Sequence, residues 1–303
     1  MSLNTQIINP YEMSDYDAVV IDIYQARNLK ENKNLDAITF FSELFLNKPY
    51  LLGALGEGVT ALFDQNPLYR TDAFDCVTLV NTVLALAISH HLQDFKKNIV
   101  AVNYYDSDPV YHKRFHFMSV DWNIQNNCHG YVEDVTKKIV NRSGKSIYHM
   151  AKTMIDRPNW FQYRTLADIK LVNKASEGEA KILLNQLHQL ASTVKSDRSE
   201  LPYLPLTELF HRDQPREDLF DQIPHGCLVE IVRPNWNLRD KIGTNLDVSH
   251  VGLVLRLKGE LIFRQASLLK KYVSDVSLIQ YLRENGLSEK SIGGINIQAF
   301  NNF

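Results

Sequence analysis

A cysteine placed where a helix is expected to begin is the feature that most constrains this chain. After Cys76, apolar side chains recur at the spacing of one buried helical face: Leu79, Val80, Val83, Leu84 and Ala87. Thr71, Asp72 and Asp75 are residue types that cap helix N-termini. Free backbone N–H groups and the helix dipole stabilise an anion there, so we expect a lowered thiol pKa and a nucleophile at Cys76. The alternative is a small buried apolar residue, as many free cysteines are.

The composition is that of a soluble protein and excludes several classes of partner. The chain has 303 residues, 45% of them hydrophobic and 22% charged, which suits one catalytic domain over residues 1–303. With 33 basic and 35 acidic residues and no basic stripe, we expect no nucleic-acid partner. No apolar run reaches 18 residues, so we expect no integral membrane segment, and residues 1–6 lack the features of a secretory signal. Three scattered cysteines, with no CxxC pair, predict neither a disulfide framework nor a structural zinc ion.

The order of the expected elements predicts an α+β fold. Helices are expected at 15–29 and 34–46, with Asn34 as the cap of the second, and residues 1–48 would form an N-terminal helical layer. The last third contains short runs typical of a mostly antiparallel sheet, with one short helix, at 227–232, 251–257, 261–263, 278–282 and 294–299. Helices first and strands later, without regular alternation, argue against a doubly wound sheet.

The middle of the chain is less regular. Residues 104–123 alternate in a way that predicts strand and loop, and residues 141–156 are polar and irregular. A helix is expected at 177–194, followed by an extended connector at 201–205. We therefore predict that residues 130–215 are a helical and loop insertion in the core.

A histidine and a glutamine are placed to support a cysteine nucleophile. His250 begins an apolar strand next to Gly252, and the turn at Lys258-Gly259 predicts a hairpin that brings Gln265 back beside it. A thiol nucleophile needs a base, and that base is best oriented by a third polar group. We therefore expect Cys76, His250 and Gln265 to form the catalytic group.

These motifs resemble those of the NlpC-type cell-wall cysteine peptidases, and within them the N-acetylmuramoyl-L-alanine amidase-like family. The resemblance runs from about residue 50 to the C-terminus. It rests on three motifs: Phe74-Asp75-Cys76-Val77-Thr78, residues 246–252 around His250, and Gln265-Ala266-Ser267. Residues 50–55 and 114–122 also resemble patterns of that family, and all these segments follow one another in the family's order. It departs at Gln265, where many relatives carry histidine, and at Gly226-Cys227, where a Gly-Asp pair often opens the strand.

The resemblance implies a papain-like core in which a helix-borne cysteine attacks an amide of peptidoglycan. The bond would be either the muramoyl-L-alanine link or the γ-D-glutamyl link to a diamino acid, with no cofactor. Tyr50 would then help the Cys76 N–H hold the oxyanion. The other oxyanion or substrate residues would be Asp75, Asp121, Trp122 and Ser249. A peptidoglycan substrate also favours the periplasm or cell envelope.

Two other functions are compatible with the same residues. The fold could serve as a non-catalytic glycan- or peptide-binding module, with Gln265 as a sign of lost activity. A zinc amidase is suggested by His112 and His116, which have the four-residue spacing of helical metal ligands. On a strand, however, residues four apart stand about 13 Å from each other, and no HExxH motif is present. We therefore predict no metal site, and Cys128 and Cys227 are expected to be structural.

Overall fold

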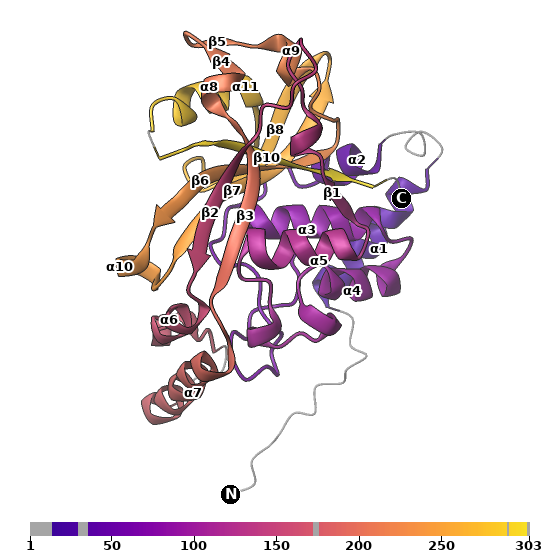
Figure 1. Ribbon diagram of the computed structural model, residues 1–303. Helices are drawn as coiled ribbons and strands as arrows, with labels where there is room; N and C mark the ends of the chain where they lie inside the picture. Colours follow the sequence, from indigo (N-terminus) through magenta and orange to yellow (C-terminus); the bar gives the residue numbers. More distant parts are fainter. Residues whose placement is uncertain (1–13, 30–35, 172–175, 290, 302–303) are drawn as a thin grey trace, which may run out of the picture.

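The computed structural model describes residues 14–29, 36–171, 176–289 and 291–301, which form an α+β fold around one large sheet (Figure 1). This sheet has eight strands in the order β2-β3-β10-β6-β7-β8-β9, with β1 also paired to β10, and neighbouring strands run antiparallel. Its strands are β1 (Val132–Asp134), β2 (His149–Ile155), β3 (Asp197–Pro205), β6 (Cys227–Asn237), β7 (Asn245–Leu257), β8 (Glu260–Ser267), β9 (Tyr272–Ser277) and β10 (Gly294–Phe300). A separate pair is formed by β4 (Phe210–His211) and β5 (Gln214–Pro215).

Helices cover the sheet and extend one end of it. The purple group at one side of Figure 1 consists of α1 (Asp15–Arg27), α2 (Ala37–Glu43), α3 (Cys76–Ala87), α4 (Leu92–Ala101) and α5 (Asn123–Cys128). At the lower end lie α6 (Arg157–Gln162) and α7 (Glu177–Gln189). The remaining short helices are α8 (Leu206–Leu209), α9 (Glu217–Phe220), α10 (Arg239–Ile242) and α11 (Leu278–Tyr281). No helix among the described residues is long and apolar enough to cross a membrane.

The core is divided by the sheet. On one face, α3 packs on β7 and β8, and the buried Leu79 and Val83 share a cluster with Leu253. On the other face, Ile231 and Phe263 pack with Leu278 of α11. Because α3 is apolar almost all round, it is buried between the sheet and the N-terminal helices α2 and α4. The packing therefore fixes the start of α3 against β7 and β8, the strands that carry His250 and Gln265.

Several predicted elements are confirmed. The cysteine helix spans Cys76–Ala87, the helix expected at 15–29 spans Asp15–Arg27, and the four predicted C-terminal strands are all present and longer than expected. The helix expected at 34–46 is shorter, Ala37–Glu43, with Asp36 as its N-cap. The predicted cap Asn34 lies outside the described residues.

The middle segment differs most from expectation. Residues 141–156, predicted to be irregular, contain β2, and the expected connector at 201–205 is the end of β3. The buried positions of β2 hold Ala151, Thr153 and Ile155. Because one of these residues is small and another is polar, the sequence lacks the alternation of large apolar and polar residues that predicts a strand. Among the described residues of 130–215, β1, β2 and β3 belong to the large sheet, whereas α6, α7, α8 and the β4–β5 pair lie outside it.

The strand predicted within 104–123 is absent: Tyr105–Ser107 and Tyr111–Lys113 are 3₁₀ turns, and only an isolated bridge joins Tyr104 to Arg114. Met118–Trp122 forms a π-helical turn that leads into α5. The Asp121 carboxylate accepts the Phe117 N–H at 2.9 Å and so closes the start of this turn. This side-chain bond competes with strand pairing, which the alternating pattern could not show.

Candidate active site

The start of α3 is fixed by a reciprocal capping box. The Asp75 carboxylate accepts the Thr78 N–H at 2.8 Å, and the Thr78 hydroxyl accepts the Asp75 N–H at 2.9 Å. The second carboxylate oxygen of Asp75 accepts the Ala54 N–H at 3.3 Å. Both oxygens of Asp75 therefore accept backbone N–H groups, and the residue fixes the start of α3 against the Ala54 loop.

Tyr50 lies directly beside this helix start. It forms a parallel bridge with Phe74, and the flanking backbone bonds are Leu51 N–H to Phe74 O (2.9 Å) and Phe74 N–H to Pro49 O (3.0 Å). Burial raises the pKa of Tyr50 to about 12, and the nearby Cys76 and Asp75 act in the same direction. Tyr50 is therefore a protonated donor close to the thiol.

The predicted hairpin brings His250 and Gln265 together, as expected. β7 and β8 pair with Leu257 opposite Glu260, across a turn in which Lys258 and Gly259 have φ of 51° and 86°. His250 Nε2 lies 2.5 Å from Oε1 of the buried Gln265. Because a carbonyl oxygen can only accept, Nε2 carries the hydrogen, and Nδ1 of the neutral ring is left free to take a proton.

Cys76 and His250 line the same cavity. It has a volume of about 150 Å³ and is also bordered by His116, Phe117 and Met118 and by residues 246–251 of β7. His250 borders a second cavity of about 610 Å³, which Gln265, Ser267 and Tyr281 also line. The histidine thus lies between the thiol and a larger open space.

Burial sets the charge state of both groups. It raises the pKa of the Cys76 thiol to about 12, and the adjacent Asp75 carboxylate adds to this. Backbone hydrogen bonds at the helix start and from Val251 oppose the shift without cancelling it. Burial also lowers the pKa of His250 to about 4. The lowered thiol pKa expected from the helix N-terminus is therefore wrong, because loss of hydration outweighs the dipole, and the resting pair is a neutral thiol and a neutral imidazole.

Asp121 and Trp122 lie in the core and do not line a substrate groove. The Asp121 carboxylate is fully buried and accepts hydrogen bonds from Arg157 and from the Tyr105 hydroxyl, the latter at 2.7 Å. Trp122 is also fully buried and donates its ring N–H to Asn81 at 2.7 Å. Ser249 does border the Cys76 cavity, but its hydroxyl donates to the Ile231 carbonyl at 3.2 Å.

The histidines considered as zinc ligands are arranged differently from a metal site. His116 is held by its contact with the Tyr111 carbonyl at 2.7 Å, and burial keeps its pKa well below the usual range. Within the described part of the chain, no group of three His, Cys, Asp or Glu side chains is arranged to hold a metal ion. The three cysteines are all unpaired: Cys128 is exposed and Cys227 is buried.

Tyr281 of α11 is a site residue that the sequence did not reveal. Its ring centroid lies 6.2 Å from that of His250 and 5.0 Å from that of Phe263. Burial raises its pKa to about 12, and the neighbouring Cys76 acts in the same direction. The tyrosine lies on a four-residue helix far along the chain, so no motif or periodicity marked it.

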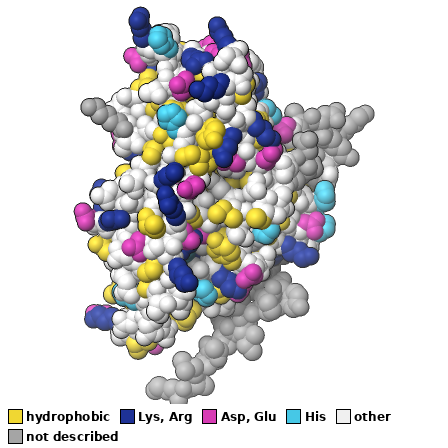
Figure 2. Space-filling model, in the orientation of Figure 1, with side chains coloured by type: hydrophobic (Ala, Val, Ile, Leu, Met, Phe, Trp, Pro, Cys, Tyr) yellow, Lys and Arg dark blue, Asp and Glu magenta, His cyan; other side chains and the backbone are white. Residues whose placement is uncertain are grey.

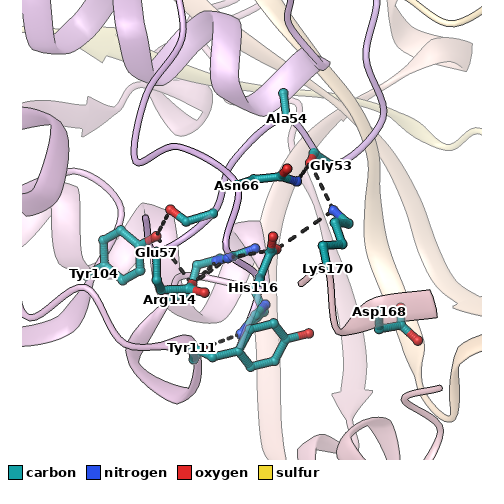
Figure 3. Close-up of polar contacts among 12 residues, drawn as sticks. Gly53, Ala54, Glu57, Asn66, Tyr104, Tyr111, Arg114, His116, Asp168 and Lys170 are labelled. Carbon is teal, nitrogen blue, oxygen red and sulfur yellow. Dashed lines mark hydrogen bonds and ion pairs between the residues drawn. The ribbon is translucent and has the colours of Figure 1, made fainter. Parts of the chain in front are cut away.

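A network of buried charges holds the loop between Tyr50 and Cys76 (Figure 3). Arg114 pairs with Glu57 and with Asp64, the latter at 3.0 Å. The backbone of the loop is bonded by three further side chains: Tyr104 donates to Gly56 O (3.1 Å), Lys170 to Gly53 O (2.9 Å) and Asn66 to Gly53 O (3.2 Å). These buried charge pairs hold the loop that follows Tyr50 in one position.

Comparison with known proteins gives both a family and a fold. The family described as AmiA-like, N-acetylmuramoyl-L-alanine amidase-like, matches residues 40–289. The crystal structure of protein LPG0564 from Legionella pneumophila, assigned to the family DUF1460, is 39% identical, with a TM-score of 0.90 over 94% of each chain.

More distant structures share the fold alone. An N-acetylmuramoyl-L-alanine amidase from Bacteroides uniformis is 22% identical with a TM-score of 0.58, covering 88% of this chain and 97% of the other. A putative xylanase from Bacteroides fragilis is 23% identical with the same TM-score, covering 86% and 99%. No curated protein matches the chain.

Proposed function

Because the chain belongs to the N-acetylmuramoyl-L-alanine amidase-like family, we propose that it is a cysteine hydrolase that cleaves an amide bond of bacterial peptidoglycan. The observation that carries the proposal is the cavity that Cys76 and His250 share, with Gln265 bonded to the far side of the imidazole. A helix-borne cysteine packed on an antiparallel sheet that carries the histidine is also the arrangement of a papain-like, NlpC-type core. The substrate class rests on the family, because the cavity is chemically compatible with many amides.

In the proposed reaction, the neutral pair becomes an ion pair only as the substrate reacts. The Cys76 sulfur attacks the amide carbon while Nδ1 of His250 takes the thiol proton, and Gln265 holds the Nε2–H side of the ring. The oxyanion accepts hydrogen bonds from the Cys76 N–H and the Tyr50 hydroxyl. The C–N bond then breaks, the leaving amine receives the proton from His250, and water hydrolyses the thioester to release the acid and free Cys76.

The test is mass spectrometry of purified peptidoglycan after incubation with the wild type, Cys76→Ala and Cys128→Ala. The exposed Cys128 supplies a matched control, since it lies outside the site. We expect the wild type and Cys128→Ala to release the same fragments, and Cys76→Ala to release at least about 10⁴-fold less, as for loss of a nucleophile.

The fragment masses distinguish the two candidate bonds. Cleavage of the muramoyl-L-alanine link separates the whole stem peptide from the sugar, whereas cleavage of the γ-D-glutamyl link leaves a dipeptide on it. Release that persists in Cys76→Ala and stops with a chelator would instead indicate a zinc amidase. Binding of cell wall without any release by the wild type would indicate the non-catalytic module.

A further inference from the structure

An exposed apolar and basic surface lies beside the larger cavity, where the turn between β8 and β9 meets the segment after α2. Five consecutive residues are exposed in this turn, in the order Leu268, Leu269, Lys270, Lys271 and Tyr272. Leu269 is 85% exposed and Leu268 is 53% exposed. Across from them, Leu52 is 74% exposed and Leu51 is also exposed. We call this set, together with Lys48, the leucine–lysine surface.

Backbone hydrogen bonds hold the two segments side by side. The Tyr50 N–H donates to the Lys271 carbonyl and the Val273 N–H to the Lys48 carbonyl, both at 2.8 Å, around a bridge between Pro49 and Tyr272. Within the turn, the Lys271 N–H donates to the Ser267 carbonyl at 2.8 Å and the Lys270 N–H to the Ser267 hydroxyl at 3.1 Å. The exposed leucines therefore lie on two segments whose backbones are hydrogen-bonded to each other beside β9.

The charge of this surface is positive and is not neutralised locally. Lys48, Lys270 and Lys271 form no ion pair with any residue in the described ranges. Of the two carboxylates that share the cavity with Lys270, Asp275 is bound by two nitrogens of Arg264 at 2.8 and 2.7 Å. Glu284, the other, accepts a hydrogen bond from Gln280 at 2.7 Å. The three lysines are therefore free to contact an anionic partner.

On the face of the molecule shown in Figure 2, by contrast, basic and acidic side chains are interspersed. Near-neutral mixed surfaces of this kind have no preference for a charged partner. At the β8–β9 turn and the segment facing it, lysines without ion pairs to other described residues lie beside highly exposed leucines.

We propose that the leucine–lysine surface binds the surface of an anionic lipid bilayer. Aliphatic side chains at the tip of a turn can enter the boundary between head groups and acyl chains, and lysines beside them meet lipid phosphates. Tyr272 supplies the amphipathic ring that is enriched at this depth. Sugar-binding surfaces use flat aromatic faces, and four leucines with one tyrosine do not provide them. Because Leu268, Leu269 and Lys270 also line the larger cavity, bilayer binding would bring that cavity to the membrane surface.

The experiment is co-sedimentation of the full chain with vesicles of phosphatidylcholine alone or mixed with phosphatidylglycerol, at low and high salt. We expect partition into the anionic vesicles that weakens with salt. Leu52→Asp and Leu269→Asp, which lie on different segments, should each weaken it roughly tenfold. Lys270→Glu combined with Lys271→Glu should weaken it by at least about twentyfold, since each lysine contributes about fivefold.

Matched controls are available on other parts of the surface. Ile182→Asp changes a 58% exposed apolar residue on α7, and Lys137→Glu with Lys138→Glu changes two exposed lysines near β10. These variants should bind as the wild type does, and circular dichroism should show that every variant is folded. Three results would overturn the proposal: no binding of the wild type to anionic vesicles, unchanged binding of both aspartate variants, or binding to insoluble peptidoglycan but not to vesicles, lost in the same variants.

Discussion

At the residue scale, the site depends on how burial sets the protonation of His250. A histidine in water would be half protonated near pH 6.5, and in that form it cannot accept the thiol proton. Burial lowers its pKa to about 4, and the neutral Gln265 beside it orients the ring without supplying charge. The proposed base is therefore unprotonated throughout the neutral range, and the proposed activity should decline only below about pH 5.

Replacement of Gln265 by Glu tests this arrangement. A carboxylate at hydrogen-bond distance favours the imidazolium, so Gln265→Glu should raise the His250 pKa by about one to two units. The acid limb of the pH profile of kcat/KM on muropeptide substrate should move to higher pH by that amount. Gln214→Glu, an exposed change on β5, serves as the control for net charge. An acid limb that stays in place in Gln265→Glu would show that His250 is not the titrating base.

At the scale of elements, the first turn of α3 connects the proposed nucleophile Cys76 to the proposed oxyanion donor Tyr50. Asp75 caps the helix and also accepts the Ala54 N–H, four residues after Tyr50. The charged network around Arg114 holds the following part of the same loop. One carboxylate therefore controls both the position of Cys76 and the approach of Tyr50.

Asp75→Ala should reduce activity more than stability. Loss of an N-cap costs about 1 kcal/mol, which urea unfolding measures. The released Ala54 loop and frayed first turn should lower kcat by about tenfold or more, since small displacements of reacting groups are costly. Ser176→Ala removes the equivalent cap of α7, far from the site, and should lose stability while keeping kcat. Equal kcat in Asp75→Ala and the wild type would contradict this role for Asp75.

At the scale of the whole molecule, a buried carboxylate in the middle of the sheet makes stability depend on pH. Glu230 lies on β6 opposite Val251 of β7 and Asn296 of β10, and is fully buried. Asn123 donates to one of its oxygens at 3.1 Å, and within the described chain the other has no partner. Burial raises its pKa to about 8, so the folded state holds a proton that the unfolded chain releases near pH 4.5.

The sign of the resulting pH dependence follows from proton binding. Between about pH 5 and 8 the folded state binds more protons at Glu230, so the free energy of unfolding should fall as pH rises, by up to roughly 1.4 kcal/mol per pH unit. Glu230→Gln should flatten this slope and stabilise the protein at pH 8. Urea unfolding across this range measures the slope, with the exposed Glu133→Gln as control. A slope equally steep in Glu230→Gln would place its origin in another group.

Local patterns by themselves determined the helix that begins at Cys76 and the hairpin that brings Gln265 to His250. Apolar spacing, cap residues and a Lys-Gly turn act over a few residues, so they can be read without the rest of the chain. The expected resemblance to the N-acetylmuramoyl-L-alanine amidase-like family was also confirmed, over residues 40–289. By contrast, β2 was missed because its buried positions include Ala151 and Thr153, whose inward direction depends on pairing with β3.

Only the tertiary structure decided how the site is solvated and what surrounds it. The helix start alone predicts a lowered Cys76 pKa, whereas packing against β7 removes water and raises it. Trp122 looked like a groove residue and is in the core, while Tyr281 carried no signal and lies beside His250. Burial and long-range proximity depend on the packing of distant segments, and these are the quantities that a local sequence pattern does not contain.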